Sequence, residues 1–200
     1  MDTEQLIFDV EEPRKKNEDY HTLEEYYNLP EGSRVELIDG VFYNLATPNT
    51  RHQIISGELS LRIRNHIAEK GGKCRVLDAP FTVQLSEKDD KTVQPDISVI
   101  CDMDKLKEKG CVGAPDWIIE IVSPSNPGHD YLTKLNLYRN SGVREYWIVD
   151  PDALSILVYE FEKSDFPVTY SFNDEVPVGI WNGKCLIDFE EIFQQIEFLL

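Results

Sequence analysis

Apolar residues recur at helical spacing in four segments, which predict helices over residues 22–29, 49–70, 129–141 and 189–198. The second is the longest, because its stripe of isoleucine and leucine continues until Gly71-Gly72 provides a stop signal. The first begins with the capping-box spacing Thr-x-x-Glu and stops before a proline. We therefore expect a few helices, each with one apolar face packed against a sheet.

Shorter apolar runs predict strands over residues 34–38, 41–46, 74–78, 80–85, 93–100, 117–122, 145–149, 154–161, 167–173 and 184–187, with a polar helical turn over 102–109. The first two strands are joined by Asp39-Gly40, which favours a hairpin with a type I′ turn. The runs at 117–122 and 145–149 are apolar at almost every position, as in strands that are covered on both faces. In the second run, Trp147 and its neighbours are predicted to have a structural role.

This order of elements predicts an α+β (α/β-like) fold with a mixed central sheet flanked by helices and an N-terminal hairpin. No repeat or linker divides the chain. Residues 1–20 lack apolar periodicity and are expected to form a loosely ordered arm. Residues 21–200 are then expected to form a single domain, in which 165–200 supply acidic C-terminal strands and a helix.

The charge of the chain limits its partners. With 200 residues, 41% hydrophobic residues and a formal net charge of −17, the chain can build a core but is not a basic coat protein for nucleic acid. Residues 51–75 are the exception, with six basic and two acidic side chains. They form either a solvated helix face or the place where an anionic ligand is least repelled. No apolar run is long enough for a membrane span, and the polar, acidic N-terminus does not resemble a signal peptide, so we expect a cytoplasmic protein.

Four cysteines occur, at positions 74, 101, 111 and 185, and no two of them have the spacing of a zinc motif. They are expected to be reduced and mostly packed in the core.

Glu120 is the most informative residue in the chain. It lies inside Ile118-Ile119-Glu120-Ile121-Val122, a strand pattern that buries both faces. A buried carboxylate costs several kcal/mol unless it is paired, hydrogen-bonded or bound to a metal. The alternatives to a functional role for Glu120 are a buried salt bridge, or an edge strand whose polar face is exposed to solvent.

Asp96 stands near the start of another predicted strand, where an isolated aspartate would be an ordinary cap. If its strand neighbours that of Glu120, the two carboxylates repel each other unless a cation or a shared proton lies between them. Oxygen ligands suit a hard cation such as Mg²⁺ or Mn²⁺. Lys134 flanks the sheet-facing stripe of the helix 129–141 and either reaches the carboxylates or extends along the margin of the stripe to solvent.

Several separated motifs occur in one order, and together they carry a resemblance. They are Val35-Glu36-Leu-Ile-Asp-Gly40, Arg51-His52, Gln94-Pro-Asp96-Ile-Ser-Val, Ala114-Pro-Asp-Trp-Ile-Ile-Glu120-Ile-Val-Ser-Pro124, Asp130 with Lys134, and Tyr138-Arg-Asn-Ser-Gly-Val-Arg-Glu-Tyr-Trp-Ile-Val-Asp-Pro151. Over about residues 20–165, the chain resembles the Uma family of putative restriction endonucleases, within the PD-(D/E)xK nuclease superfamily.

The resemblance implies a metal-dependent endonuclease that hydrolyses phosphodiester bonds in DNA. Asp96 and Glu120 match the metal-binding acids, and the main-chain carbonyl of Ile121 is expected to be a third ligand for Mg²⁺ or Mn²⁺. The superfamily lysine is replaced by Val122, and Lys134 matches the relocated lysine of the Uma family. In this mechanism the metal activates a water molecule, and Lys134 orients that water or stabilises the developing charge.

Glu36 and His52 match family positions that can complete the pocket, although Glu36 could instead be an exposed hairpin residue and His52 an ordinary residue of a first helical turn. The acidic body opposes tight duplex binding by one subunit, and we expect a homodimer. Two other functions stay open. The first is a weakly active or inactive module that keeps the nuclease fold and acts through protein–protein contacts. The second is a metal-free hydrolase that uses Asp96 and Glu120 as an acid–base pair.

Overall fold

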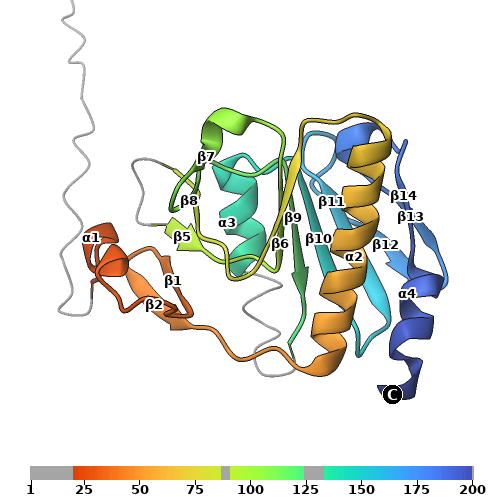
Figure 1. The fold of residues 1–200 in the computed structure, drawn as a ribbon, viewed down its shortest axis with the longest axis horizontal. Helices are drawn as coiled ribbons and strands as arrows, with labels where there is room; N and C mark the ends of the chain where they lie inside the picture. Colours follow the sequence, from red (N-terminus) through yellow and green to blue (C-terminus); the bar gives the residue numbers. More distant parts are fainter. Residues whose placement is uncertain (1–19, 87–90, 124–132, 200) are drawn as a thin grey trace, which may run out of the picture.

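The computed structural model describes residues 20–86, 91–123 and 133–199, and its strands form two six-stranded sheets and a two-stranded ribbon (Figure 1). The central sheet has the order β12-β11-β10-β9-β6-β3. Its strands are β3 (Arg75–Asp78), β6 (Ile97–Ile100), β9 (Trp117–Ile121), β10 (Glu145–Asp150), β11 (Ser155–Glu160) and β12 (Val168–Ser171). Only β9 and β10 pair in parallel, and the other neighbours are antiparallel. The central sheet is therefore mixed, as predicted.

The second sheet contains the predicted hairpin and has the order β2-β1-β5-β4-β8-β7. Its strands are β1 (Val35–Ile38), β2 (Val41–Asn44), β4 (Val83–Gln84), β5 (Lys91–Val93), β7 (Leu106–Lys107) and β8 (Gly110–Val112). Asp39 and Gly40 both have positive φ angles, of 50° and 81°, as a type I′ turn requires. The ribbon is β13 (Glu175–Pro177) with β14 (Leu186–Asp188).

Four α-helices were predicted, and the described ranges contain α1 (Leu23–Tyr27), α2 (Thr50–Glu69), α3 (Lys134–Ser141) and α4 (Phe189–Ile196). The capping box at Thr22 is present, and Gly71, with a φ of 61°, follows α2. The first residues of the predicted helix 129–141, including the motif residue Asp130, lie outside the described residues. The expected N-terminal arm also lies outside them, apart from Tyr20. No helix in the described ranges is both long and apolar enough to cross a membrane.

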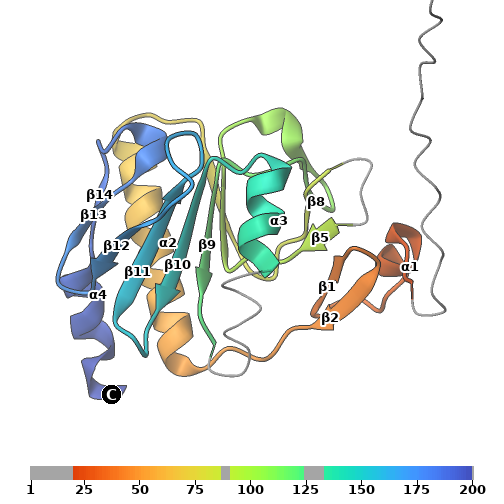
Figure 2. The same ribbon diagram turned by 180° about the vertical axis from the view of Figure 1, so that it is seen from behind.

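The two faces of the central sheet pack against different partners. One face, with Trp117, Trp147 and Val149, packs against α2 and α4, and the other, with Tyr146 and Ile148, packs against α3 and the second sheet. Figure 1 views the sheet from the α2 side, and Figure 2 views it from the α3 side. The strands β9 and β10 are consequently buried on both faces, as their continuous apolar runs predict.

Some strand predictions were wrong in detail. The single strand expected over 93–100 is two strands in two different sheets, β5 and β6, separated by Gln94-Pro95-Asp96. Proline has no N–H for a sheet hydrogen bond, so it falls naturally at this break. The turn expected over 102–109 is a 3-10 helix at Met103–Lys105 followed by β7. The strands β8 and β13 were not predicted, because each has only three residues and no alternating apolar pattern.

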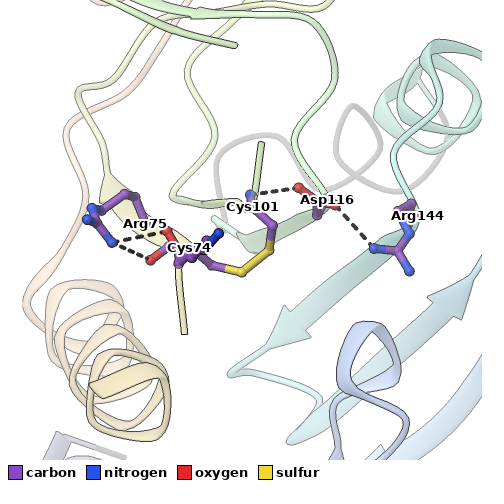
Figure 3. The surroundings of a disulfide bond; sticks show 6 residues. Cys74, Arg75, Cys101, Asp116 and Arg144 are labelled. Atoms are coloured by element: carbon purple, nitrogen blue, oxygen red, sulfur yellow. Dashed lines mark hydrogen bonds and ion pairs between the residues drawn. A yellow bond between two sulfur atoms is a disulfide. The ribbon is translucent and has the colours of Figure 1, made fainter. Parts of the chain in front are cut away.

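The expectation of four reduced cysteines was also wrong. Cys74 and Cys101 form a disulfide, and only Cys111 and Cys185 are free and buried (Figure 3). The β3–β6 register pairs Arg75 with Ile100, so the two bonded cysteines are the next cross-strand pair along the same ladder. The sequence separation of 27 carries no signal of this pairing. Burial raises the pKa of both free thiols to about 11.

Candidate functional site

The antiparallel pairing of β6 with β9 brings two acidic residues to one end of the central sheet. Ile97 pairs with Ile119, so the next position along the same register would set Asp96 opposite Glu120. At this end the strands no longer continue their regular ladder. Instead, the Ile121 N–H donates to Asp96 Oδ2 over 2.8 Å. The two acids therefore lie on neighbouring strands at the same end of the central sheet.

Asp96 is held from the α2 side of the sheet. His52 Nε2 lies 3.0 Å from Asp96 Oδ2, and the backbone N–H of His52 donates to the Oδ1 atom of Asn49, the residue that caps α2. His52 is buried and lies in the first turn of α2, so it is both a residue of a first helical turn and a group that contacts Asp96. The contact fixes one oxygen of Asp96, and the other oxygen, Oδ1, accepts no hydrogen bond within the described part of the chain.

Glu120 is held from the α3 side by a buried lysine. Lys134 Nζ lies 2.9 Å from Glu120 Oε1 and 3.2 Å from Glu36 Oε1, and all three side chains are at most 4% exposed. Lys134 therefore does not extend to solvent, and Glu36 is not an exposed hairpin residue. The buried salt bridge considered for Glu120 does exist, and its partner is the lysine that was expected to reach the carboxylates.

Two further residues complete this network, and neither was predicted. Tyr138, one helical turn after Lys134, donates its hydroxyl to Glu120 Oε1 over 2.5 Å. Burial, followed by the charge of Glu120, raises the pKa of Tyr138 well above 10, so the phenol stays a donor at neutral pH. Gln94 donates its backbone N–H to Glu36 Oε1 over 3.0 Å. Tyr138 was quoted as the first residue of a family motif and was given no role in the site, although its spacing of four from Lys134 places both on one helix face.

A cavity of about 410 Å³ lies at this end of the central sheet. Its wall includes Asp96, Glu120 and Lys134, together with Arg34 and Tyr43 from the hairpin. A smaller cavity of about 200 Å³ shares Arg34, His52 and Asp96 with the first. The larger cavity is of the size that holds small ligands or single groups of larger ones.

The donors in this cavity fit a hard cation. Asp96, Glu120 and the main chain of Ile121 supply oxygen atoms, which Mg²⁺ and Mn²⁺ prefer, and Asp96 Oδ1 is not committed to another partner. In the described part of the chain, no three His, Cys, Asp or Glu side chains form a ready metal-ligand group. A cation here would therefore need main-chain or solvent oxygens beside the two carboxylates.

Comparisons with known proteins agree with this architecture. A family model described as "Putative restriction endonuclease", named Uma2, matches residues 18–178. The uncharacterized protein slr1290 of Synechocystis sp. is 30% identical over 139 residues, which are 68% of this chain and 72% of that protein. The crystal structure of a putative nuclease belonging to DUF820 from Anabaena variabilis superposes with a TM-score of 0.70 at 24% identity, over 86% of this chain and 97% of the other. At that identity the superposition shows a shared fold.

Proposed function

Because the chain belongs to the Uma2 family of putative restriction endonucleases, we propose that it is a nuclease that hydrolyses phosphodiester bonds in DNA with the help of Mg²⁺ or Mn²⁺. The observation that carries this proposal is the meeting of Asp96, Glu120 and Lys134 in one cavity. These three residue types, at these places in the sheet and on α3, match the motif expected for the family. The likeness in fold to the Anabaena protein supports the same assignment.

Asp96, Glu120 and the carbonyl of Ile121 would hold the metal ion. When bound, the cation would polarise the phosphate and lower the pKa of a bound water molecule so that it attacks phosphorus. The protein side chains would position these ligands. His52 and the Ile121 N–H hold one oxygen of Asp96, while Lys134 and Tyr138 hold one oxygen of Glu120.

Lys134 would also act on the substrate. Its ammonium group lines the cavity, and it carries a positive charge between two glutamates. From this place it can donate to the attacking water or to a phosphate oxygen as negative charge develops. Glu36 would keep Lys134 protonated and pointed toward Glu120, because a lysine between two carboxylates is stabilised in its charged form.

A cleavage assay tests the proposed activity. Purified protein is incubated with supercoiled plasmid and with single-stranded DNA, in Mg²⁺, in Mn²⁺ and in EDTA. We expect cleavage with either metal and none in EDTA. Asp96→Asn should lower the rate by a factor of at least about a hundred, while Asp104→Asn, which removes the same charge from an exposed position, should not.

The other outcomes of this assay select the other functions. Mn²⁺ binding by calorimetry without any cleavage would select a module that keeps the site but acts through protein contacts. Cleavage that persists unchanged in EDTA would select a metal-free acid–base mechanism. Either result would overturn the proposed function.

A further inference from the structure

Arg34 lies immediately before β1 and lines both cavities that contain Asp96. Its backbone carbonyl accepts the N–H of Leu45 as part of the hairpin. Its side chain has no comparable structural partner. The Nε atom of Arg34 is buried and makes no hydrogen bond, and no ion pair or hydrogen bond of its guanidinium occurs within the described residues.

Arg34 differs in this respect from the other arginines of the described ranges. Five of them, at positions 51, 62, 64, 139 and 144, pair with carboxylates. The sixth, Arg75, donates to the main-chain carbonyls of Lys73 and Cys74. A guanidinium carries five N–H donors, and a partly buried one without acceptors loses hydration without compensation. An arginine in this state, facing a cavity, is suited to bind an anion from outside the chain.

The charges around the cavity favour a phosphate as that anion. Asp96, Glu120 and Glu36 bring negative charge to this region, and Lys134 is already engaged by both glutamates. A strand of nucleic acid that enters the cavity therefore needs another cation to offset repulsion by the carboxylates. Arg34 supplies it in the same cavities that Asp96 lines, and its planar fork fits two oxygens of one phosphate group.

We propose that Arg34 binds a phosphate of the nucleic-acid strand next to Asp96 and thereby holds the substrate in the cavity. This inference rests on the proposed nuclease function and names a substrate-binding residue for it. Arg34 is a positioning residue for the strand. Its loss should therefore weaken binding more than it slows the chemical step in a bound complex.

The test measures the affinity of the full chain for a fluorescent single-stranded 12-nucleotide DNA in EDTA, and KM and kcat for the same DNA in Mg²⁺. We expect Arg34→Ala to raise Kd and KM by about tenfold to a hundredfold, the range for a charge-assisted hydrogen-bonded contact, with a smaller change in kcat. Arg34→Lys should fall between Arg34→Ala and the wild type, because it keeps the charge but loses the fork.

Arg75→Ala is the matched control. It removes the same charge from an exposed residue of β3 that lines neither cavity, and it should change Kd less than about twofold. The slope of log Kd against log salt should fall by about 0.7 in Arg34→Ala, as expected for one lost phosphate contact to a single strand. If Arg34→Ala does not fold, Arg34→Gln takes its place, since it keeps much of the side-chain stem.

The outcomes separate the two proposals. A wild-type protein that cleaves DNA, with an Arg34→Ala variant that matches it within twofold in Kd, KM and salt slope, would overturn the role of Arg34 and leave the nuclease function intact. A wild-type protein that neither binds nor cleaves DNA would overturn both. A loss that is as large in Arg75→Ala would show a general charge effect and would also overturn the role of Arg34.

Discussion

At the scale of single residues, Lys134 is the charge on which the buried network depends. It lies between two carboxylates that are almost completely buried, Glu36 and Glu120. Two buried acids without a cation would repel each other and lose hydration at the same time. The lysine that is proposed to act in catalysis therefore also has to stabilise the fold.

Lys134→Met is expected to lower the free energy of unfolding by about 3–5 kcal/mol in EDTA, because it leaves two buried carboxylates without their cation. Urea denaturation measures the loss. Adding Glu120→Gln to Lys134→Met should restore part of it, since one of the stranded charges is then removed. Lys184→Met, at an exposed position, serves as the control. A midpoint for Lys134→Met equal to that of the wild type would contradict the role of this ion network.

A further buried acid, Glu145, lies outside the cavity, at the start of β10. Its carboxylate accepts N–H groups from Trp147, Gly179 and Ile180 at 2.7–2.9 Å. Burial raises the pKa of Glu145 above its usual 4.5, although these three donors act in the opposite direction. The folded state therefore holds this proton more tightly than the unfolded chain does.

This raised pKa predicts a pH dependence of stability. The contribution of Glu145 is fully present below the pKa of an unfolded glutamate and is lost as the pH rises through its higher value in the folded state. The stability of the wild type relative to Glu145→Gln should therefore fall as the pH rises above the usual glutamate pKa of 4.5. Urea melts of both proteins at a series of pH values on both sides of 4.5 measure it, with the exposed Glu175→Gln as the control. A difference that stays constant or grows with pH would contradict the raised pKa.

The residues of the site were predictable to different degrees. Glu120 stands out in the sequence because it places a charge inside an apolar strand, whereas Asp96 and Lys134 were assigned to the site mainly through the resemblance of their motifs to those of the family. Arg34 and Tyr138 do not stand out, because an arginine before a hairpin and a tyrosine in a helical stripe are ordinary. Their roles in the site depend on which strands and helices pack together in the fold, and the local sequence pattern does not predict that packing.

At the scale of secondary-structure elements, the sequence predicted the boundaries most accurately where an apolar pattern repeats over many residues. The helix α2 has 20 residues, a capping residue and a glycine stop, and it was predicted to within one residue at each end. The pair β5 and β6 was predicted as one strand, because the break between them is only three residues long. The assignment of these strands to two separate sheets results from tertiary packing, which local patterns do not report.

The disulfide links two elements, the start of β3 and the end of β6, at the opposite end of β6 from Asp96 (Figure 3). Replacing Cys74 and Cys101 together with serine should lower the free energy of unfolding by about 2–4 kcal/mol, because the bond closes a loop with a sequence separation of 27. Urea denaturation measures this loss. Thiol titration of the denatured protein should find two thiols before reduction and four after it. Four thiols before reduction would contradict the bond.

The strand β10 is held in the core by Trp147, which is completely buried and lies against Trp117 with a distance of 4.7 Å between ring centroids. Trp147→Ala should lower the free energy of unfolding by about 3–5 kcal/mol, since it creates a cavity and removes a donor from Glu145. The exposed Leu186→Ala should change it by less than about 0.5 kcal/mol. Urea midpoints that are equal for the two variants would show that β10 does not depend on this packing.

At the scale of the whole molecule, the net charge of −17 opposes the binding of a second polyanion. Two copies of the chain would bring two cavities and two sets of basic side chains from α2 to one DNA molecule, and we expect the protein to be a homodimer. Light scattering should then report twice the 23.1 kDa of one chain. A mass of 23.1 kDa at micromolar concentration would contradict the dimer.

The cytoplasmic location stays a prediction. The bond between Cys74 and Cys101 weighs against it, because stable disulfides are uncommon in reducing compartments. The thiol titration described above bears on this question as well as on stability.

The parallel pairing of β9 with β10 also determines when the site can form as the chain is synthesised. Glu120 is on β9, but its strand is completed on one side by residues 145–149 of β10, which leave the ribosome later. Pairings between strands that are distant in sequence form slowly, and a parallel pair needs a long crossover between its strands. A nascent chain that ends before β10 contains Asp96, Glu120 and Lys134 but lacks the strand that supports them. The proposed nuclease would therefore gain its cutting activity only once most of its fold is assembled.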